Sequence, residues 1–159
     1  MDQIKLHPRI NITVLGHKGM LGHMVYKVLQ KNDNFKVSYV STRFPDWEKS
    51  MFRYTNFIIN CIGAIPQKTN EFDINWEVPI WLEKNTNCKI IHPATDCEID
   101  DDSYSVSKKI ATDYINDYCE ETKIIQTSVI GPELDSNYSL LEWFLSQKGE
   151  VEGYTKAIW

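Results

Sequence analysis

Apolar residues recur along the chain with two different periods, and the two periods alternate. Residues 10–15 (INITVL) form a short β-rich run, and from Met20 apolar positions return every three or four residues until the polar break at 31–34 (KNDN). Residues 35–40 (FKVSYV) again have strand character. The first forty residues therefore predict strand, glycine turn, helix and strand, which is a βαβ unit.

The same alternation continues through the rest of the chain. Further strands are predicted at 57–62, 89–92 and 123–130, and helices at 75–84 and 104–119. The strands are continuous Ile and Val runs rather than alternating apolar and polar positions, which is typical of strands covered on both faces. We therefore predict an α/β fold: a Rossmann-like, doubly wound parallel sheet with helices on both faces.

Length and charge narrow the class of protein. A chain of 159 residues fits a single domain, so we expect residues 1–159 to form one Rossmann-like domain. The net charge of -5 argues against a nucleic-acid partner. The apolar run at 57–65 is too short to cross a bilayer, and the first ten residues lack a secretory signal. We expect a cytoplasmic protein with no membrane contact.

The cysteines give no sign of a metal site. They stand far apart, without a CxxC pair or a histidine at zinc-binding spacing, at Cys61, Cys88, Cys97 and Cys119. We therefore predict reduced thiols, mostly in the core, and no metal.

The turn after the first strand carries the strongest motif. It reads Gly16-His17-Lys18-Gly19-Met20-Leu21-Gly22, a GxxGxxG pattern. Gly16 permits the tight turn, Gly19 lets the backbone approach a diphosphate, and Gly22 lets the helix pack closely on the sheet. The helix N-terminus offers N–H groups to the phosphate. A glycine turn without a ligand is the alternative. The residues assigned to cofactor binding are Gly16, Lys18, Gly19, Met20, Leu21 and Gly22.

The end of the second strand favours NADP over NAD. NAD-binding sites commonly have an acidic residue there, which bonds to the ribose hydroxyls, whereas this chain has Ser41, Thr42 and Arg43. Two hydroxyls and a guanidinium suit a 2′-phosphate, and Lys18 could add to this charge. NAD remains possible, because Arg43 could equally be a solvated surface cation.

A Thr, Tyr and Lys set is typical of carbonyl reduction. Tyr104 and Lys108 form a YxxxK sequence at the start of a predicted helix, and Thr95 follows the preceding strand. Hydride addition to a ketone leaves an oxyanion that Tyr104 could protonate, while the Lys108 ammonium stabilises the phenolate. Thr95 could donate a hydrogen bond to the substrate carbonyl, and Lys108 could also hold the nicotinamide ribose. The alternative is an ordinary helix start with a solvated lysine.

Five motifs together resemble the extended short-chain dehydrogenase/reductase superfamily: VLGHKGMLG, FIINCIGAIPQ, ATDCEID, YSVSK and IIQTSVIG. Within it the chain is most similar to the dTDP-4-dehydrorhamnose reductase-like nucleotide-sugar reductases, on Thr95-Asp96 and the tail SLLEWFLSQKGEVEGYTKAIW. The resemblance implies Thr95, Tyr104 and Lys108 as the catalytic residues. It also implies cofactor contacts from the glycine turn, Arg43, Cys61, Ile62, Gly63, Tyr104 and Lys108.

The resemblance further implies an NAD(P)H-dependent oxidoreductase that reduces the ketone of a nucleotide sugar in deoxysugar or polysaccharide biosynthesis. Asn75 matches an asparagine that supports such sites, and a polar residue on a helix surface is the alternative. An epimerase or dehydratase on the same fold would need further acid and base groups, which we do not find in the sequence.

Two departures from the family pattern favour a different function. Tyr104 follows Thr95 by only nine positions, where the family has a longer loop, and we expect the family's C-terminal substrate-binding lobe to be largely absent. A homo-oligomer or a partner chain could supply that lobe, in which case the aromatic residues Trp143, Phe144, Tyr154 and Trp159 would face it. Packing of these aromatics into the domain's own core is the alternative. The competing function is a non-catalytic NADP-binding regulatory or assembly subunit.

Overall fold

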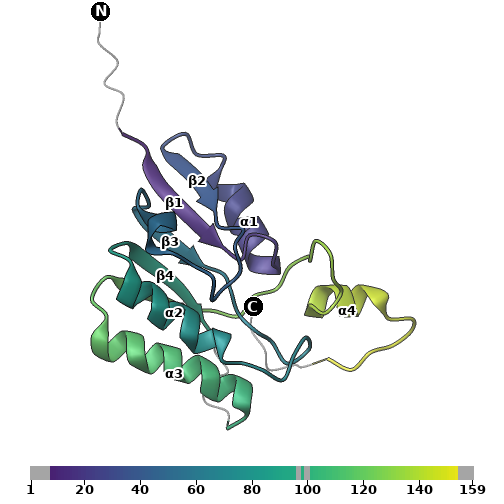
Figure 1. Ribbon diagram of the computed structural model, residues 1–159. Coiled ribbons are helices and arrows are strands. Elements are labelled where there is room, and N and C mark those ends of the chain that lie inside the picture. The colour runs from purple at the N-terminus through teal and green to yellow at the C-terminus, as the bar shows by residue number, and fades with distance from the viewer. Residues whose placement is uncertain (1–7, 96–97, 99–100, 154–159) are drawn as a thin grey trace, which may run out of the picture.

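Strands and helices alternate along the chain in the computed structural model, which describes residues 8–95, 98 and 101–153 (Figure 1). The strands are β1 (Ile10–Leu15), β2 (Phe35–Tyr39), β3 (Phe57–Asn60), β4 (Lys89–Ala94) and β5 (Thr122–Gln126). The helices are α1 (Met20–Leu29), the 3-10 helix η1 (Lys49–Phe52), α2 (Ile74–Asn85), α3 (Ser103–Tyr118) and α4 (Leu140–Ser146).

The five strands form one parallel sheet in the order β2-β1-β3-β4-β5. β1 pairs with β2 on one side and with β3 on the other, so the direction of winding reverses between β1 and β3. In open α/β sheets, ligands bind at the carboxyl ends of the strands beside such a reversal. The topology therefore predicts a ligand site where β1 and β3 end.

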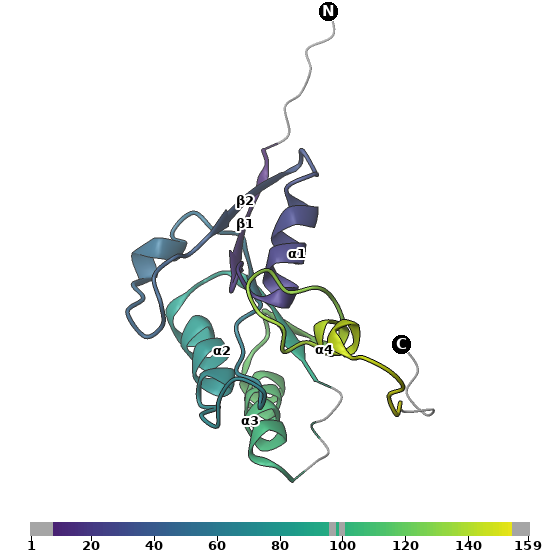
Figure 2. The ribbon, with the colours of Figure 1, turned by 90° about the vertical axis from the view of Figure 1, so that its right-hand side faces the viewer.

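Helices cover both faces of the sheet, as Figure 2 shows: α1 lies on one side, and α2 and α3 lie together on the other. This confirms the predicted Rossmann-like, doubly wound architecture. The hydrophobic core cluster lies on the α2 side of the sheet. None of the helices in the described parts of the chain combines the length and apolarity that a membrane span requires.

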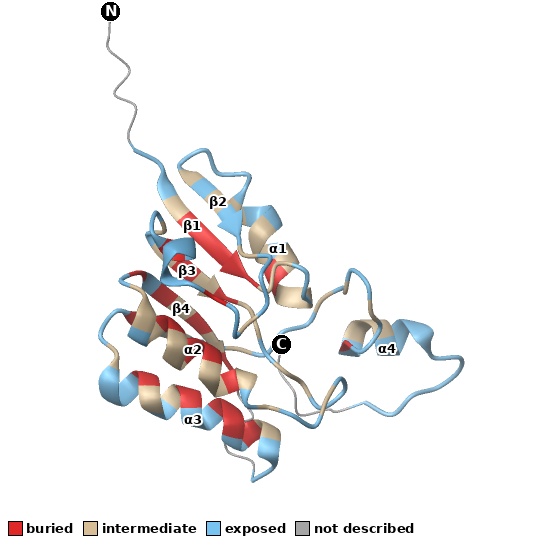
Figure 3. Cartoon of the chain, viewed as in Figure 1, coloured by how far each residue is buried: buried red, intermediate tan, exposed pale blue. Residues whose placement is uncertain are grey.

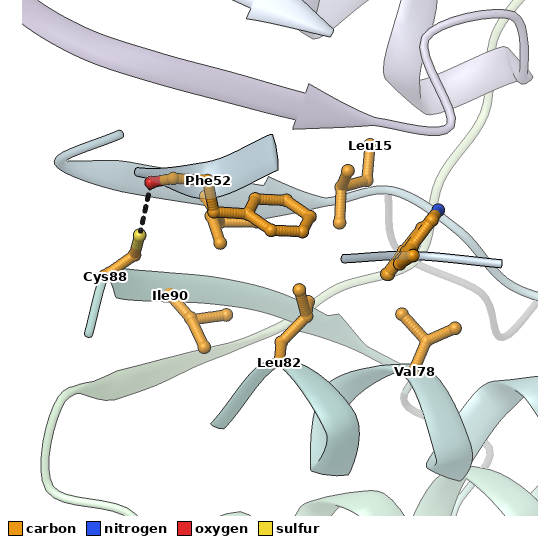
Figure 4. Close-up of a cluster of buried hydrophobic side chains, with 8 residues drawn as sticks. Leu15, Phe52, Val78, Leu82, Cys88 and Ile90 are labelled. Carbon is orange, nitrogen blue, oxygen red and sulfur yellow. Dashed lines mark hydrogen bonds between the residues drawn. The ribbon is translucent and has the colours of Figure 1, made fainter. Parts of the chain in front are cut away.

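The core packs α2 against the middle strands (Figure 4). Val78 and Leu82 on α2 meet Leu15, Ile58 and Ile90, all with 1% or less of their surface exposed. The strand register places Ile58 opposite Ile90 and opposite Thr13, two residues before Leu15, so the three side chains point to the same face. Each buried aliphatic side chain stabilises the fold by about 2 kcal/mol. The packing of α2 on β1, β3 and β4 holds these strands in place, and the loops that form the candidate site follow their carboxyl ends.

Beside the core, an aromatic cluster joins the connection between β2 and β3 to α2. It consists of Phe44, Trp47, Phe52 and Trp81, in edge-to-face or tilted contacts with ring centroids 5.2 to 6.4 Å apart. The Trp47 indole N–H donates to the Thr42 carbonyl oxygen at 2.8 Å. The cluster thus anchors the residues that follow β2, including Arg43, to α2.

Some element ends differ from the sequence prediction, for local reasons. β3 ends at Asn60 rather than 62, because the Asn60 side chain accepts a hydrogen bond from the Ile62 N–H (3.1 Å) and turns the chain. β5 spans Thr122–Gln126 rather than 123–130, because its partner β4 ends at Ala94, opposite Gln126. Apolar character alone does not reveal where a neighbouring strand stops.

Helix α4 was not predicted, and it lies apart from the sheet (Figure 3). Ser139 caps its N-terminus by accepting from the Glu142 N–H, which is half of an S-x-x-E capping box visible in the sequence. None of its residues is buried, and Trp143 and Phe144 are 43% and 55% exposed. These two aromatics therefore do not join the core, whereas Tyr154 and Trp159 lie outside the described residues.

Candidate functional site

The turn after β1 has the geometry of a phosphate loop. Gly16 has φ +69°, and a Cβ there would lie 2.7 Å from the Cys61 carbonyl oxygen. A Cβ on Gly22 would collide with the Gly16 backbone, 2.6 Å from its carbonyl carbon. Both positions therefore need glycine for the backbone path itself.

Gly19 differs from the other two glycines. It is exposed, and the only described atom near a Cβ built there is the Gly16 carbonyl oxygen, 3.3 Å away. It is the N-cap residue of α1, and no side chain caps that helix. A Cβ on Gly19 would therefore meet one backbone oxygen, a milder contact than at Gly16 or Gly22, and the uncapped N–H groups of the helix N-terminus beside it could bind an anion.

The residues after β2 are exposed, and Arg43 borders a groove. Ser41, Thr42 and Arg43 are all solvent-accessible. Arg43 lines a groove of about 1100 Å³ that Gly63 and Ala64 also line, so the end of β2 and the loop after β3 share one hollow. Lys68 and Lys84 and the acidic residues Glu71, Asp73 and Glu77 line the same groove.

A ring stack that the sequence analysis missed covers the neighbouring part of the turn. His17 stacks on Tyr39 with ring centroids 3.9 Å apart, and Tyr26 meets Tyr39 edge-on at 5.6 Å. Partial burial and the charge of Lys18 lower the pKa of His17, so this imidazole is neutral at pH 7. Lys18 itself is exposed.

The loop after β3 brings the glycine turn and α3 together. Gly63 is so placed that a Cβ would lie 3.3 Å from both the Asn75 Oδ1 and the Lys108 Nζ atoms. Burial raises the pKa of the neighbouring Cys61 thiol to about 12, so it stays protonated. The strip of backbone predicted to run along the cofactor therefore lies directly against the predicted catalytic lysine.

Asn75 holds this loop in place. Its Oδ1 accepts from the Ala64 N–H (2.7 Å), and its Nδ2 donates to the Ala64 carbonyl oxygen (3.1 Å) and to Ser107 Oγ (3.0 Å). Asn75 is 1% exposed, so it is not a polar residue on a helix surface. The amide joins the loop after β3 to α3, one residue from Lys108.

The start of α3 positions Tyr104 and Lys108. Asp102 caps the helix, accepting from the backbone N–H groups of Tyr104 (2.9 Å) and Ser105 (3.1 Å). Tyr104 is half-buried and packs edge-on against Phe72 at 5.8 Å. The carboxylate thus fixes the turn of α3 that carries the tyrosine.

The Lys108 side chain is buried, not solvated. It is 9% exposed, and burial lowers the pKa of its ammonium, while the charge of Glu98 opposes that effect. Thr95 is equally buried and follows β4 at the same sheet edge; its carbonyl oxygen accepts from Gln126 Nε2 (3.2 Å). All three predicted catalytic residues therefore lie around the carboxyl edge of the sheet.

A buried polar pair behind this edge was also missed. Asn60 and His92 are each 1% exposed, and Asn60 Nδ2 lies 3.2 Å from His92 Nδ1. Burial, and then the charge of Lys108, lower the pKa of His92 to about 3, so the imidazole is neutral. Within the described residues, His92 Nε2 has no hydrogen-bond partner. The sequence signal was a histidine at the period-two spacing of the buried positions 90 and 94.

The cysteines fit the prediction of core thiols in part. Cys88 is buried and donates to the Thr55 carbonyl oxygen (3.2 Å), whereas Cys61 and Cys119 are only half-buried. Cys97 lies outside the described residues. Across 8–95, 98 and 101–153, no group of three or more His, Cys, Asp or Glu residues is arranged to hold a metal ion.

Comparison with known proteins supports the fold. No protein-family model matches the sequence, and a search of curated proteins finds no match. A UDP-glucuronic acid 4-epimerase from Bacillus cereus, in complex with UDP-glucuronic acid and NAD, is similar in structure: TM-score 0.63, 13% identity, covering 74% of this chain and 56% of that one. The chain thus spans little more than half of that protein.

Two further solved structures are similar. The capsular polysaccharide assembling protein CapF from Staphylococcus aureus has a TM-score of 0.63 and 18% identity, over 91% of this chain and 44% of its own. A thiolation-reductase di-domain from an archaeal non-ribosomal peptide synthetase has a TM-score of 0.57 and 12% identity, over 74% of this chain and 40% of its own. At such identities, the similarity establishes a shared fold.

Proposed function

We propose that this chain is the cofactor-binding part of an NADP-dependent reductase that acts on a 4-keto-6-deoxy nucleotide sugar. The observation that carries the proposal is the contact at Gly63. Gly63 lies in the loop that follows β3, beside the glycine turn. Its backbone is so close to the buried Lys108 that a Cβ on Gly63 would lie 3.3 Å from the Lys108 Nζ atom. A dinucleotide bound along that loop would bring its nicotinamide end to the Tyr104 and Lys108 side.

The residues of the site fit such a cofactor. Gly19 leaves space at the start of α1, and the helix N-terminus there attracts a diphosphate. Arg43 supplies a cation beside the groove that Gly63 lines, which suits the 2′-phosphate of NADP. When bound, the reduced cofactor supplies the hydride for the ketone carbon.

Residues of this chain would supply the proton that the alkoxide needs. As the carbonyl becomes an alkoxide, the Tyr104 hydroxyl donates its proton to that oxygen, and the alcohol forms. The buried Lys108 ammonium stabilises the resulting phenolate, because opposite charges interact more strongly away from water. Thr95 donates a hydrogen bond to the same substrate oxygen. Asn75 keeps the loop beside Lys108 in position through its three hydrogen bonds.

The nucleotide-sugar part of the proposal is supported by the similar structures. The Bacillus cereus protein is an epimerase of a UDP-sugar and was solved with NAD, and CapF is a capsular polysaccharide assembling protein. The preference for NADP rests instead on Arg43 and on the lack of an acidic residue after β2.

The first experiment measures cofactor binding. NADPH and NADH are titrated into the wild-type protein, the Arg43→Glu variant and the Arg53→Glu variant. Arg53 is an exposed arginine at the end of η1, so its variant makes the same change of charge away from the groove. We expect Arg43→Glu to weaken NADPH binding by about tenfold or more, since charge-assisted hydrogen bonds contribute about 1.5 to 3 kcal/mol.

NADH binding should change little in Arg43→Glu, and Arg53→Glu should behave as wild type. Equal loss of NADPH and NADH affinity would refute the NADP assignment. Absence of binding of either nucleotide to the wild-type protein would refute the cofactor site as a whole.

A second candidate function is a non-catalytic NADP-binding assembly or regulatory subunit. The short connection between Thr95 and Tyr104, which stand only nine positions apart, favours it. Incubation with NADPH and dTDP-4-keto-6-deoxyglucose separates the two functions. Loss of NADPH absorbance indicates the reductase, whereas tight NADPH binding without turnover indicates the subunit.

A further inference from the structure

Two loops that leave the carboxyl edge of the sheet are joined by an ion pair. The loop of residues 61–73 follows β3, and the segment of residues 127–139 follows β5 and leads into α4. Lys68 of the first and Glu133 of the second are in contact, with Nζ and Oε1 2.9 Å apart. This pair joins parts of the chain 65 residues apart.

Glu133 accepts hydrogen bonds on both carboxylate oxygens. Besides Lys68, Ser136 Oγ donates to Oε1 (2.7 Å), and the backbone N–H groups of Tyr138 (2.6 Å) and Ser139 (2.9 Å) donate to Oε2. Its side chain is 4% exposed. Burial acts to raise the pKa of this carboxyl, but the hydrogen bonds prevail and lower it to about 2. Glu133 therefore fixes the residues that start α4.

Lys68 also contacts Ser136 and Tyr138, two of the residues that donate hydrogen bonds to Glu133. Its ammonium also donates to Ser136 Oγ (3.0 Å) and lies 5.4 Å from the centroid of the Tyr138 ring. The cation thus contacts the carboxylate, a hydroxyl and an aromatic face of one segment. This differs from the exposed pair of Lys89 and Glu121, which are 62% and 63% exposed and 3.9 Å apart.

Both loops line a pocket of about 710 Å³. Gln67, next to Lys68, lines it together with residues of the second segment and of α4, which are Asn137, Tyr138, Leu140 and Trp143. Glu152 and Gly153 complete the lining. Two aromatic rings and two amides suit a ligand with a ring face and hydroxyl groups.

The loop of residues 61–73 also reaches the predicted catalytic residues. Gly63 lies against Lys108 at one end of the loop, and Phe72 packs on Tyr104 at the other. Gln67 and Lys68 lie between these two contacts. A ligand in the pocket is therefore held by the same loop that touches the reacting side of the site.

We propose that Lys68 and Glu133 are positioning residues, which hold α4 against the loop of residues 61–73 and so complete the pocket for the part of the substrate remote from its reacting carbonyl. The substrate assignment rests on the proposed function. Neither residue takes part in the chemical step, so their loss should weaken substrate binding and leave the proton transfer intact.

The variants Lys68→Gln, Glu133→Gln and their double test this in steady-state kinetics with dTDP-4-keto-6-deoxyglucose. We expect the KM of each single variant to rise about tenfold, because hydrogen bonds to a charged group are strong. kcat should stay within about twofold of wild type in every variant, and so should the Kd of NADPH in Glu133→Gln, because Glu133 does not line the groove that Arg43 borders. The double variant should be no worse than either single one, since both break the same contact.

Two controls mark the specificity of the effect. Lys68→Arg keeps the charge, so its KM should stay near that of wild type rather than rise as in Lys68→Gln. Lys89→Gln breaks the exposed ion pair and should change nothing. A KM that stays at the wild-type value in Glu133→Gln, or a parallel loss of kcat and NADPH affinity, would overturn the proposal.

Hydrogen–deuterium exchange gives a readout that needs no turnover. In Glu133→Gln, the amides of residues 134–146 should exchange faster, while those of β1 and β3 keep wild-type protection. If the wild-type protein neither binds nor reduces the nucleotide sugar, the proposed function is wrong. The positioning role of Lys68 and Glu133 is then tested by hydrogen–deuterium exchange alone. Faster exchange then still supports its positioning role, and unchanged exchange overturns it.

Discussion

At the scale of single residues, the site is built by burying groups that are usually exposed. Lys108, Asn75, His92 and Asn60 are all at least nine-tenths buried, and they lie behind or beside the carboxyl edge of the sheet. Buried polar groups cost free energy unless they are paired. Asn75 makes three hydrogen bonds, whereas Lys108 is held near a neutral imidazole rather than a second cation.

Tyr104 is predicted to be the proton donor, and removing its hydroxyl tests this. Tyr104→Phe should lower kcat by about 10² to 10⁴, the usual contribution of a positioned acid, and leave NADPH affinity within about twofold. Tyr118→Phe is the matched control, because Tyr118 ends the same helix and is 73% exposed. Undiminished ketone reduction by Tyr104→Phe would exclude this tyrosine as the acid.

His92 should make stability depend on pH. Its pKa is about 3 in the folded protein and near 6.5 when unfolded, so the unfolded state binds more protons between these values. The stabilising contribution is fully present above pH 6.5 and declines as the pH falls toward 3. Between pH 7 and 5 the loss is about 2 kcal/mol.

Urea denaturation at pH 7 and pH 5 measures this loss. His92→Gln has no titrating group and keeps an amide that can pair with Asn60, so its free energy of unfolding should fall less over the same interval. An identical fall in the wild-type and variant proteins would show that His92 does not carry the effect.

At the scale of elements, the turn between β1 and α1 contains two glycines that the fold requires and one that we propose for cofactor binding. Gly16 and Gly22 are required by close backbone contacts, whereas a Cβ on Gly19 would meet only the Gly16 carbonyl oxygen, at 3.3 Å. The three positions look equivalent in the sequence motif. Only the structure shows which of them the fold itself needs.

Substituting alanine at two of these positions should therefore give different results. Gly22→Ala should lower the thermal midpoint strongly, because its Cβ would collide with the Gly16 backbone. Gly19→Ala should unfold near the wild-type midpoint but bind NADPH ~tenfold more weakly, a loss of about 1.4 kcal/mol. Calorimetry and fluorescence titration measure the two effects. A Gly19→Ala protein with full affinity would argue against a phosphate at this turn.

The sequence predicted the elements well where the apolar period was strong, and poorly where ends depend on partners. All five strands and the helices α1, α2 and α3 were predicted within a few residues of their bounds. The far end of β5 was wrong, because it is set by the end of β4. The Lys68–Glu133 pair was not foreseeable, since nothing local relates residues 65 positions apart.

At the scale of the whole molecule, cofactor binding should stabilise the fold. A ligand at a hundred times its Kd adds about 2.7 kcal/mol to the free energy of unfolding, which for a domain of this size raises the midpoint by about 5 °C or more. We expect NADPH to produce this shift in a thermal scan of the wild-type protein. Arg43→Glu should show a clearly smaller shift at the same NADPH concentration, and an equal shift would contradict the role of Arg43.

The aromatic cluster beside Arg43 has a practical consequence. Trp47 and Trp81 are 5.6 Å apart, and Trp81 also lines the groove that Arg43 borders. Reduced nicotinamide absorbs light at the wavelengths at which indoles emit. The chain thus carries a built-in optical reporter: ultraviolet excitation of its own indoles should reveal nucleotide docking by quenching, without any attached dye.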